Sequence, residues 1–177
     1  MSAPEGSELS MERVTKDELL ATVQADRDRF ESVLQKVPSD LPTEPILPGG
    51  WSVKDVLAHV AWGDREAIGM VRARALVGSE LWEVSEDERN EAVVRENRSR
   101  TLEEVLAEYR AAFDDYMTAL SSLSEEELNE PSRFAGLAER IPDWRPWRVL
   151  YDPAHYDDHG QTIASALDRL ESPTQRA

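Results

Sequence analysis

The stretch DPAHYDDHGQ, residues 152–161, decides how this chain is organised. Its Asp-Pro start is typical of a helix N-terminus, because an Asp side chain caps free backbone amides and proline is tolerated at the first helical position. A helix that begins there places His155 and His159 one turn apart on the same side. Two imidazoles at this spacing can bind one divalent metal ion, although spacing alone favours a metal site no more than a chance pair.

The chain has one other histidine, His59, in a segment expected to be helical from Ser52 to Val77. Three protein ligands leave a coordination position for water or substrate, as in catalytic zinc sites. On a helical wheel His159 and His155 lie roughly 40° and 80° from the centre of their apolar stripe, whereas His59 lies roughly 110–120° from the centre of its own. The two late histidines therefore face the interior, and His59 is not an obvious core residue.

Composition restricts the classes of function. The chain has 177 residues, 40% of them hydrophobic and 32% charged, which suits one soluble domain. A formal net charge of −16 argues against binding to nucleic acids or anionic membranes. The chain contains no cysteine, so any thiol chemistry needs a thiol from outside.

No apolar run approaches the roughly 20 residues of a membrane span, and the N-terminus lacks the basic and then apolar residues of a secretion signal. We therefore expect a cytoplasmic protein.

Helical periodicity and capping residues predict an all-α fold, a four-helix bundle with long connections and short extra helices. No alternation typical of strands, glycine-rich phosphate loop or GxSxG elbow is present. The best amphipathic stripe lies between Leu102 and Leu120. The helices are expected to follow the cap residues Thr15, Ser52, Ser85, Thr101, Ser124 and Asp152.

The same patterns predict the limits of the domain. We expect residues 1–14 to be a flexible tail, residues 15–171 to form a single bundle domain, and residues 172–177 to be a second tail. Residues 131–150 are expected to be a long irregular connection. Helical periodicity also predicts which way two groups of side chains point. The charged residues 26–29 should face solvent, and Leu170 should face the interior.

Several side chains are candidates for the wall of a pocket. Asp64 falls within the apolar stripe of its helix, where a carboxylate needs a hydrogen-bonded or charged partner, and we favour an arginine partner over a catalytic task. Trp144 and Trp147 lie just before the histidine helix, where they either cover the edge of the core or wall a pocket. The candidate pocket residues are Trp51, Trp62, Asp64, Trp144, Trp147 and Tyr156.

The motif GWSVKDVLAHVAW at residues 50–62, followed by His155-Tyr-x-x-His159, resembles the DinB/YfiT-like superfamily of candidate metalloenzymes. The segments TKDELL at residues 15–20 and TLEEVL at 101–106 make the chain similar to the ClbS/DfsB branch of that superfamily. The resemblance implies a DinB-like four-helix bundle. It also implies that His59, His155 and His159 bind a divalent ion, usually zinc or nickel.

The resemblance implies two kinds of activity. One is an isomerase or S-transferase reaction on a small electrophile with a low-molecular-weight thiol such as mycothiol, bacillithiol or glutathione. The other, from the ClbS/DfsB branch, is hydrolysis of a reactive small molecule without obligatory metal, which serves detoxification and self-resistance. The histidine triad is not universal in that branch, so its presence here favours the metal-dependent activity.

Further points stay open at this stage. A third hypothesis is a non-catalytic bundle that sequesters a ligand or regulates a partner. No catalytic base can be assigned, and Asp64 and Tyr156 are candidates by position only. We expect a small-molecule substrate, and the resemblance adds a homodimer as a further partnership.

Overall fold

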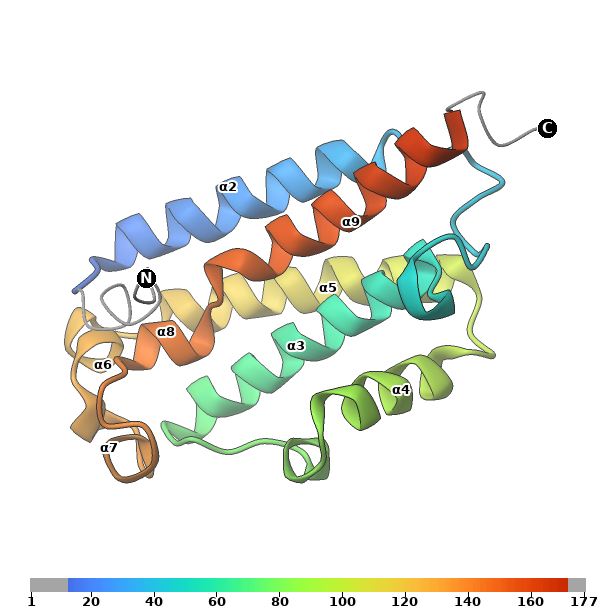
Figure 1. Ribbon diagram of the computed structural model, residues 1–177. Coiled ribbons are helices and arrows are strands. Elements are labelled where there is room, and N and C mark those ends of the chain that lie inside the picture. Colours follow the sequence, from blue (N-terminus) through green and yellow to red (C-terminus); the bar gives the residue numbers. More distant parts are fainter. Residues whose placement is uncertain (1–12, 172–177) are drawn as a thin grey trace, which may run out of the picture.

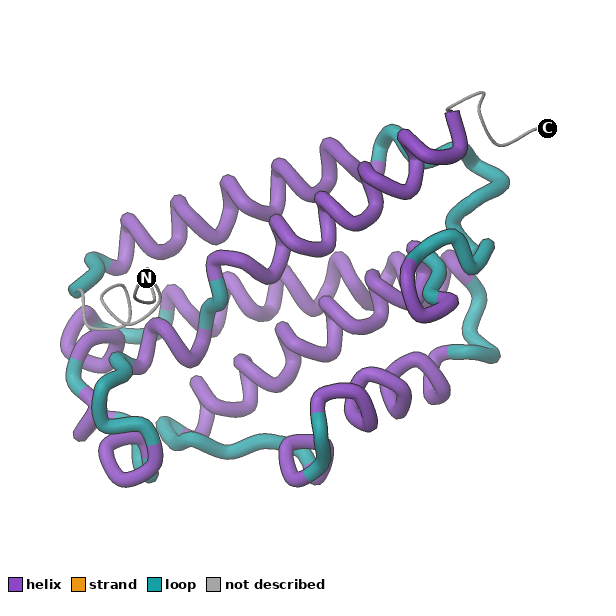
Figure 2. Tube along the Cα trace, viewed as in Figure 1, coloured by secondary structure: helices purple, strands orange, loops and turns teal. Residues whose placement is uncertain are grey.

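Four long helices run side by side along the bundle, and the structure is a computed structural model that describes residues 13–171 (Figure 1). The described residues contain no strand, apart from one isolated bridge between Ala75 and Ala135 (Figure 2). The prediction of an all-α fold is therefore confirmed. The long helices are α2 (Lys16–Leu34), α3 (Val53–Ala73), α5 (Leu102–Ser121) and α9 (Pro153–Glu171).

Shorter helices close the ends and one side of the bundle. The region 131–150, expected to be irregular, contains a 3₁₀ turn and two short helices, α7 and α8. Each has five residues or fewer, which is too short to show a helical period in the sequence. The short helices are α4 (Glu86–Asn97), α6 (Glu125–Asn129), α7 (Leu137–Arg140) and α8 (Pro146–Leu150), with 3₁₀ turns at Pro48–Gly50, Glu80–Glu83 and Pro131–Arg133.

Reciprocal capping fixes most helix starts. At each of five starts a Ser or Thr hydroxyl accepts a hydrogen bond from the amide three residues on, and the acidic side chain of that residue accepts one from the cap amide. The exchange satisfies two backbone donors that would otherwise lack partners. The cap residues are those predicted from the sequence: Thr15, Ser52, Ser85, Thr101 and Ser124.

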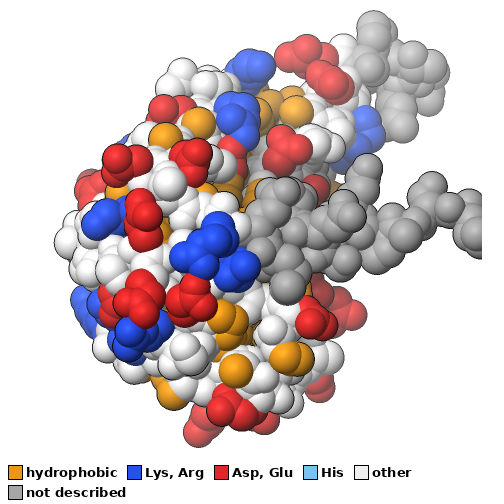
Figure 3. Space-filling view, turned by 90° about the vertical axis from the view of Figure 1, so that its left-hand side faces the viewer, with side chains coloured by type: hydrophobic (Ala, Val, Ile, Leu, Met, Phe, Trp, Pro, Cys, Tyr) orange, Lys and Arg blue, Asp and Glu red, His pale blue; other side chains and the backbone are white. Residues whose placement is uncertain are grey.

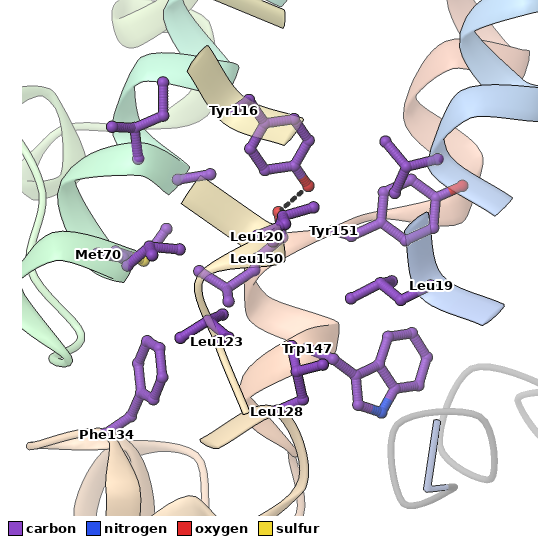
Figure 4. Packing of buried hydrophobic residues seen from close by; sticks show 14 of the residues in the cluster. Leu19, Met70, Tyr116, Leu120, Leu123, Leu128, Phe134, Trp147, Leu150 and Tyr151 are labelled. Carbon is purple, nitrogen blue, oxygen red and sulfur yellow. Dashed lines mark hydrogen bonds between the residues drawn. The ribbon is translucent and has the colours of Figure 1, made fainter. Parts of the chain in front are cut away.

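The long helices pack in a defined order that places the candidate histidines. α3 packs against α5 on one side and α4 on the other, while α2 packs against α9 and α5. Buried apolar side chains fill the space between them in two clusters, one at each end of the bundle. Figure 4 shows the cluster at the α6–α8 end, where the side chains of Leu123, Leu128 and Trp147 meet below Tyr116.

A buried lysine holds α4 against the start of α3. The ammonium of Lys54 donates hydrogen bonds to the carbonyl oxygens of Asn97, Arg98 and Arg100, at 3.2, 3.3 and 2.9 Å. These carbonyls follow the end of α4, where a cation is favoured by the free carbonyl groups and the helix dipole. The contact fixes α4 beside α3, and α4 thereby supplies residues to the site described below.

Two predicted orientations are wrong. Asp26 and Arg27, expected at the wet face of α2, are buried, whereas Leu170 is 51% exposed in the last turn of α9. The guanidinium of Arg27 lies 3.5 Å from the ring centre of Tyr109 and 4.4 Å from that of Phe113. A planar guanidinium on an apolar stem can pack on aromatic faces, so a charged residue type does not by itself indicate an exposed position.

One end face of the molecule carries acidic and basic side chains interspersed with small hydrophobic areas (Figure 3).

Val14, placed in the tail by the sequence, exchanges two hydrogen bonds with the side chain of Asn129, at 2.9 and 2.8 Å. Residues 1–12 and 172–177, the rest of the two expected tails, lie outside the described residues. Among the described residues, no helix is both long and apolar enough to span a membrane.

Two buried tyrosines of α5 provide a test of the packing. The Tyr116 hydroxyl donates a 2.8 Å hydrogen bond to the carbonyl oxygen of Leu150, whereas the buried Tyr109 hydroxyl has no partner among the described residues (Figure 4). We expect Tyr116→Phe to lower the free energy of unfolding by about 1–3 kcal/mol, because it leaves a buried carbonyl unsatisfied. Tyr109→Phe keeps the ring under Arg27 and should be neutral or stabilising.

Urea denaturation of both variants makes the comparison. Equal destabilisation by the two substitutions would contradict the assigned hydrogen bond, since both remove one hydroxyl from the interior of α5.

Candidate metal centre

The three histidines of the chain meet between two helices. His59 projects from α3, and His155 and His159 project from successive turns of α9. Their ring centres are 5.2 Å apart for His59 and His155, 5.1 Å for His59 and His159, and 4.8 Å for His155 and His159. The structure therefore brings together all three residues that the sequence proposed as ligands.

The ring nitrogens are spaced as a shared ion would require. One nitrogen from each ring can be chosen so that all three lie within 4.8 Å of one another. Nε2 of His59 and Nε2 of His155 are 3.1 Å apart. Nitrogens bound to one zinc ion at 2.0–2.1 Å in tetrahedral geometry are about 3.4 Å apart. The donor set thus fits a divalent metal ion bound by three imidazoles after small side-chain adjustments.

Burial and mutual repulsion keep the imidazoles neutral. Burial lowers the pKa of His59 to about 3, helped by the charges of His155, His159 and Arg89. Burial also lowers the pKa of His159 to about 4, with His155 as the second cause. The pKa of His155 is lowered by burial as well, against the opposing influence of Asp152 and Asp158. Neutral rings at physiological pH have a free lone pair, which is the form that binds a metal.

A cavity of about 250 Å³ opens beside the triad. Its wall includes His59 and His155 together with side chains from α3, α4, α5, α9 and the segment before α9. Those that bear on the chemistry are Trp62, Asp64, Trp82, Arg89, Asn90, Tyr151 and Tyr156. A small molecule in this cavity would lie against the histidines and a carboxylate at once.

Asp64 is the buried carboxylate of the cavity. It is 7% exposed, and its Oδ2 atom has no hydrogen-bond partner among the described residues. Burial raises its pKa to about 7, while the positive charge of Arg27 and the nearby hydroxyl of Tyr156 act in the opposite direction. The arginine partner predicted for Asp64 is not seen as an ion pair among the described residues, and Arg27 acts on the carboxyl group only through its charge. A carboxyl group with a pKa near 7 can take up or release a proton at physiological pH.

Of the four tryptophans predicted to line the pocket, one lies in the cavity wall. Trp62 lines the cavity, as do Asp64 and Tyr156. Trp51 does not, but its ring packs edge-on against His59 with centres 5.7 Å apart.

Trp144 and Trp147 also lie away from the cavity wall. Trp147 is buried in the core cluster of Figure 4, and the guanidinium of Arg148 covers Trp144 at 4.9 Å. The short helix α8, invisible in the sequence, turns Trp147 into the core.

Several residues of the cavity were not predicted, among them Trp82, Arg89, Asn90 and Tyr151. Trp82 lies in the 3₁₀ turn at Glu80–Glu83, and Arg89 and Asn90 lie on α4, whose sequence is mostly polar. The guanidinium of Arg89 lies 4.8 Å from the ring centre of Trp82 and 5.8 Å from that of Trp62. Residues on a polar surface helix carry no period that would indicate a pocket, so only the packing of α4 against α3 reveals them.

Comparison with solved structures supports the fold. A crystal structure of a Streptococcus pneumoniae protein, determined as a structural genomics target, superposes with a TM-score of 0.73 at 16% sequence identity, covering 95% of this chain and 98% of that one. At this level of identity the likeness concerns the fold alone. No curated protein matches the chain.

Comparison with family models identifies the group to which the chain belongs. The model described as the mycothiol maleylpyruvate isomerase N-terminal domain matches residues 23–148, a span that includes His59 and ends before the other two histidines. This family is linked to metal binding and mycothiol, and the match does not support a closer placement in the ClbS/DfsB branch. The chain therefore belongs to the mycothiol maleylpyruvate isomerase N-terminal domain family, within the DinB/YfiT-like superfamily.

Proposed function

We propose that the protein is a metal-dependent enzyme that uses a low-molecular-weight thiol on a small electrophile. It would act either as an S-transferase, which joins the two, or as an isomerase. The observation that carries the proposal is the cluster of three neutral imidazoles within 4.8 Å of one another at the wall of a cavity. Membership of a family linked to metal and mycothiol adds support. A chain without cysteine has no thiol of its own for such a reaction.

The triad would hold the metal ion in this proposal. A zinc or nickel ion bound by three imidazoles supplies a Lewis acid that lowers the pKa of a coordinated thiol or water near neutral pH. His59, His155 and His159 need not lose a proton to bind it, because burial already holds their pKa values low. Three protein ligands would leave one coordination position for a thiol or water.

Asp64 is the proposed proton acceptor. It lies in the wall of the same cavity, and its pKa of about 7 allows it to receive the thiol proton and return it to the product. Tyr156 shares that wall, and burial raises the pKa of its hydroxyl, which keeps it a neutral hydrogen-bond donor. Arg27, behind Asp64, favours the ionised carboxylate after the proton has left.

One observation favours the alternative function, a protective hydrolase of the ClbS/DfsB type. Asp64 lines the cavity with an unpartnered oxygen, and it could activate water for attack on a strained ring without any metal. The two functions differ in their dependence on the triad. Turnover of the electrophile that survives loss of the histidines would support the hydrolase, and binding without turnover would support a sequestering protein.

Zinc binding is the first test. We expect protein purified without a histidine tag to bind one zinc ion per chain in isothermal titration calorimetry. With free zinc at about 100 times Kd, the free energy of unfolding should rise by about 2.7 kcal/mol. Each of His59→Ala, His155→Ala and His159→Ala should weaken binding by more than the roughly 10–100-fold seen for outer-shell partners.

Gln161→Ala is the matched control, because Gln161 is an exposed residue of α9 whose side chain bonds only to Asp157 in the structure. Unchanged zinc affinity in all three histidine variants would contradict the proposed centre.

Thiol transfer is the second test. The zinc-loaded protein is supplied with mycothiol, bacillithiol or glutathione in turn, with 1-chloro-2,4-dinitrobenzene as a chromogenic electrophile. Transfer forms a carbon–sulfur bond and releases chloride. We expect one thiol to react faster with the protein than without it, and His155→Ala to abolish the difference. Equal rates in wild type and His155→Ala would contradict a metal-dependent transferase.

The buried Asp64 predicts a pH dependence of stability. Its pKa is raised from 3.8 to about 7 on folding, so between these values the folded state holds a proton that the unfolded chain lacks. The resulting stability is present at low pH and is lost as the pH rises through 7. We expect metal-free Asp64→Asn to be more stable than wild type at pH 8 by on the order of 1–2 kcal/mol, with a smaller advantage at pH 5.

Urea denaturation at the two pH values measures this difference. The histidines have lowered pKa values and act in the opposite direction, losing stability as the pH falls below about 6.5, but they do so equally in both proteins. Asp114→Asn, at an exposed position of α5, is the control and should show no such change. An advantage of Asp64→Asn that is the same at both pH values would show that Asp64 does not titrate as proposed.

A further inference from the structure

A second hollow adjoins the metal cavity. It has a volume of about 370 Å³ and lies between the end of α3, the segment that follows it, and the end of α7. We call it the Trp82 groove. Its walls include Met70, Leu76, Val77, Trp82, Arg140 and Ile141.

The Trp82 groove and the metal cavity have common walls. Met70 and Trp82 line both. The metal cavity, at about 250 Å³, is smaller than the roughly 300–1,000 Å³ usual for small-molecule sites. The two shared residues place the hollows side by side as two compartments.

Trp82 is held in place between the compartments. Glu66 of α3 accepts a 2.6 Å hydrogen bond from the indole Nε1 of Trp82 and a 2.8 Å bond from the amide of Ser79. The ring lies over Gly78, where a Cβ atom would overlap it, and its centre is 5.8 Å from that of Trp62. Even so, Trp82 is 47% exposed. The guanidinium of Arg89 lies 4.8 Å from the ring centre of Trp82, and the exposed part of the fixed indole offers apolar surface to a ligand.

Exposed apolar side chains are concentrated at this place. Four large hydrophobic residues of the described chain are exposed, and two of them, Val77 and Trp82, line the Trp82 groove. The segment that carries Val77 is fixed by hydrogen bonds from the Leu76 amide to the Ala135 carbonyl and from the Ala135 amide to the Arg74 carbonyl, at 2.9 and 2.8 Å. A fixed apolar patch beside a cavity is typical of a binding site.

We propose that the Trp82 groove binds the apolar body of the same small molecule whose reacting group lies at the histidine triad. The occupant is an uncharged aromatic or branched aliphatic group that packs on Trp82, Val77 and Ile141. The position of the reacting group rests on the proposed function. The apolar compartment itself depends only on the described side chains.

The first experiment uses metal-free protein and the uncharged fluorescent probe N-phenyl-1-naphthylamine. Val77→Asp places a charge on the groove, and we expect it to weaken probe binding by at least about tenfold. Leu170→Asp is the matched control, because Leu170 is equally exposed but lies at the far end of α9, and it should leave binding unchanged. Circular dichroism confirms that both variants fold. Equal binding to wild type and Val77→Asp would overturn the proposed groove.

The second experiment uses zinc-loaded protein and two metal-binding hydroxamates, acetohydroxamate and 4-phenylbutanohydroxamate. If the compartments are joined, the phenylalkyl tail should increase affinity by at least about tenfold in wild type. Val77→Asp should remove this gain and leave acetohydroxamate binding unchanged. A gain that persists in Val77→Asp, or no gain in wild type, would overturn the joined site. Failure of zinc to bind would instead refute the proposed function, and the first experiment would still decide whether the groove binds apolar ligands.

Discussion

The structure depends on one constraint: three imidazoles occupy a space in which none of them can easily be protonated. His59 on α3 and the histidine pair on α9 have ring nitrogens within 4.8 Å of one another. Burial and the charges of the neighbouring rings both disfavour the imidazolium form. A cluster of neutral lone pairs is suited to a cation, so the placement of α3 and α9 in the bundle leaves a site that could hold a metal ion.

The interior next to the triad is polar for a helical bundle. Arg27, Asp64, Tyr109 and Tyr156 are all buried, and each has a side-chain atom without a hydrogen-bond partner among the described residues. Every such atom costs roughly 1–3 kcal/mol relative to a satisfied one. Apolar side chains at these positions would give a more stable bundle. The retained polar groups are consistent with a site in which stability is sacrificed for proton transfer and ligand binding.

The sequence predicted the parts of this arrangement that local rules govern. Cap residues located the starts of α2, α3 and α5, and the spacing of His155 and His159 placed both on one side of α9. It failed where tertiary contacts overrule residue type. Arg27 is buried because aromatic rings cover its guanidinium, and Trp147 reaches the core because α8 turns it inward. Arg89 reaches the cavity through the packing of α4 on α3, and Trp82 through its hydrogen bond to Glu66, and neither contact leaves a pattern in the sequence.

X-ray absorption at the zinc edge of the loaded, tag-free protein tests the central claim most directly, because it counts and identifies the atoms bound to the ion. We predict three imidazole nitrogens at about 2.0–2.1 Å, accompanied by one oxygen ligand from solvent. One or two imidazoles, or a shell made of carboxylate and water oxygens alone, would show that His59, His155 and His159 do not act as a unit and would contradict this account.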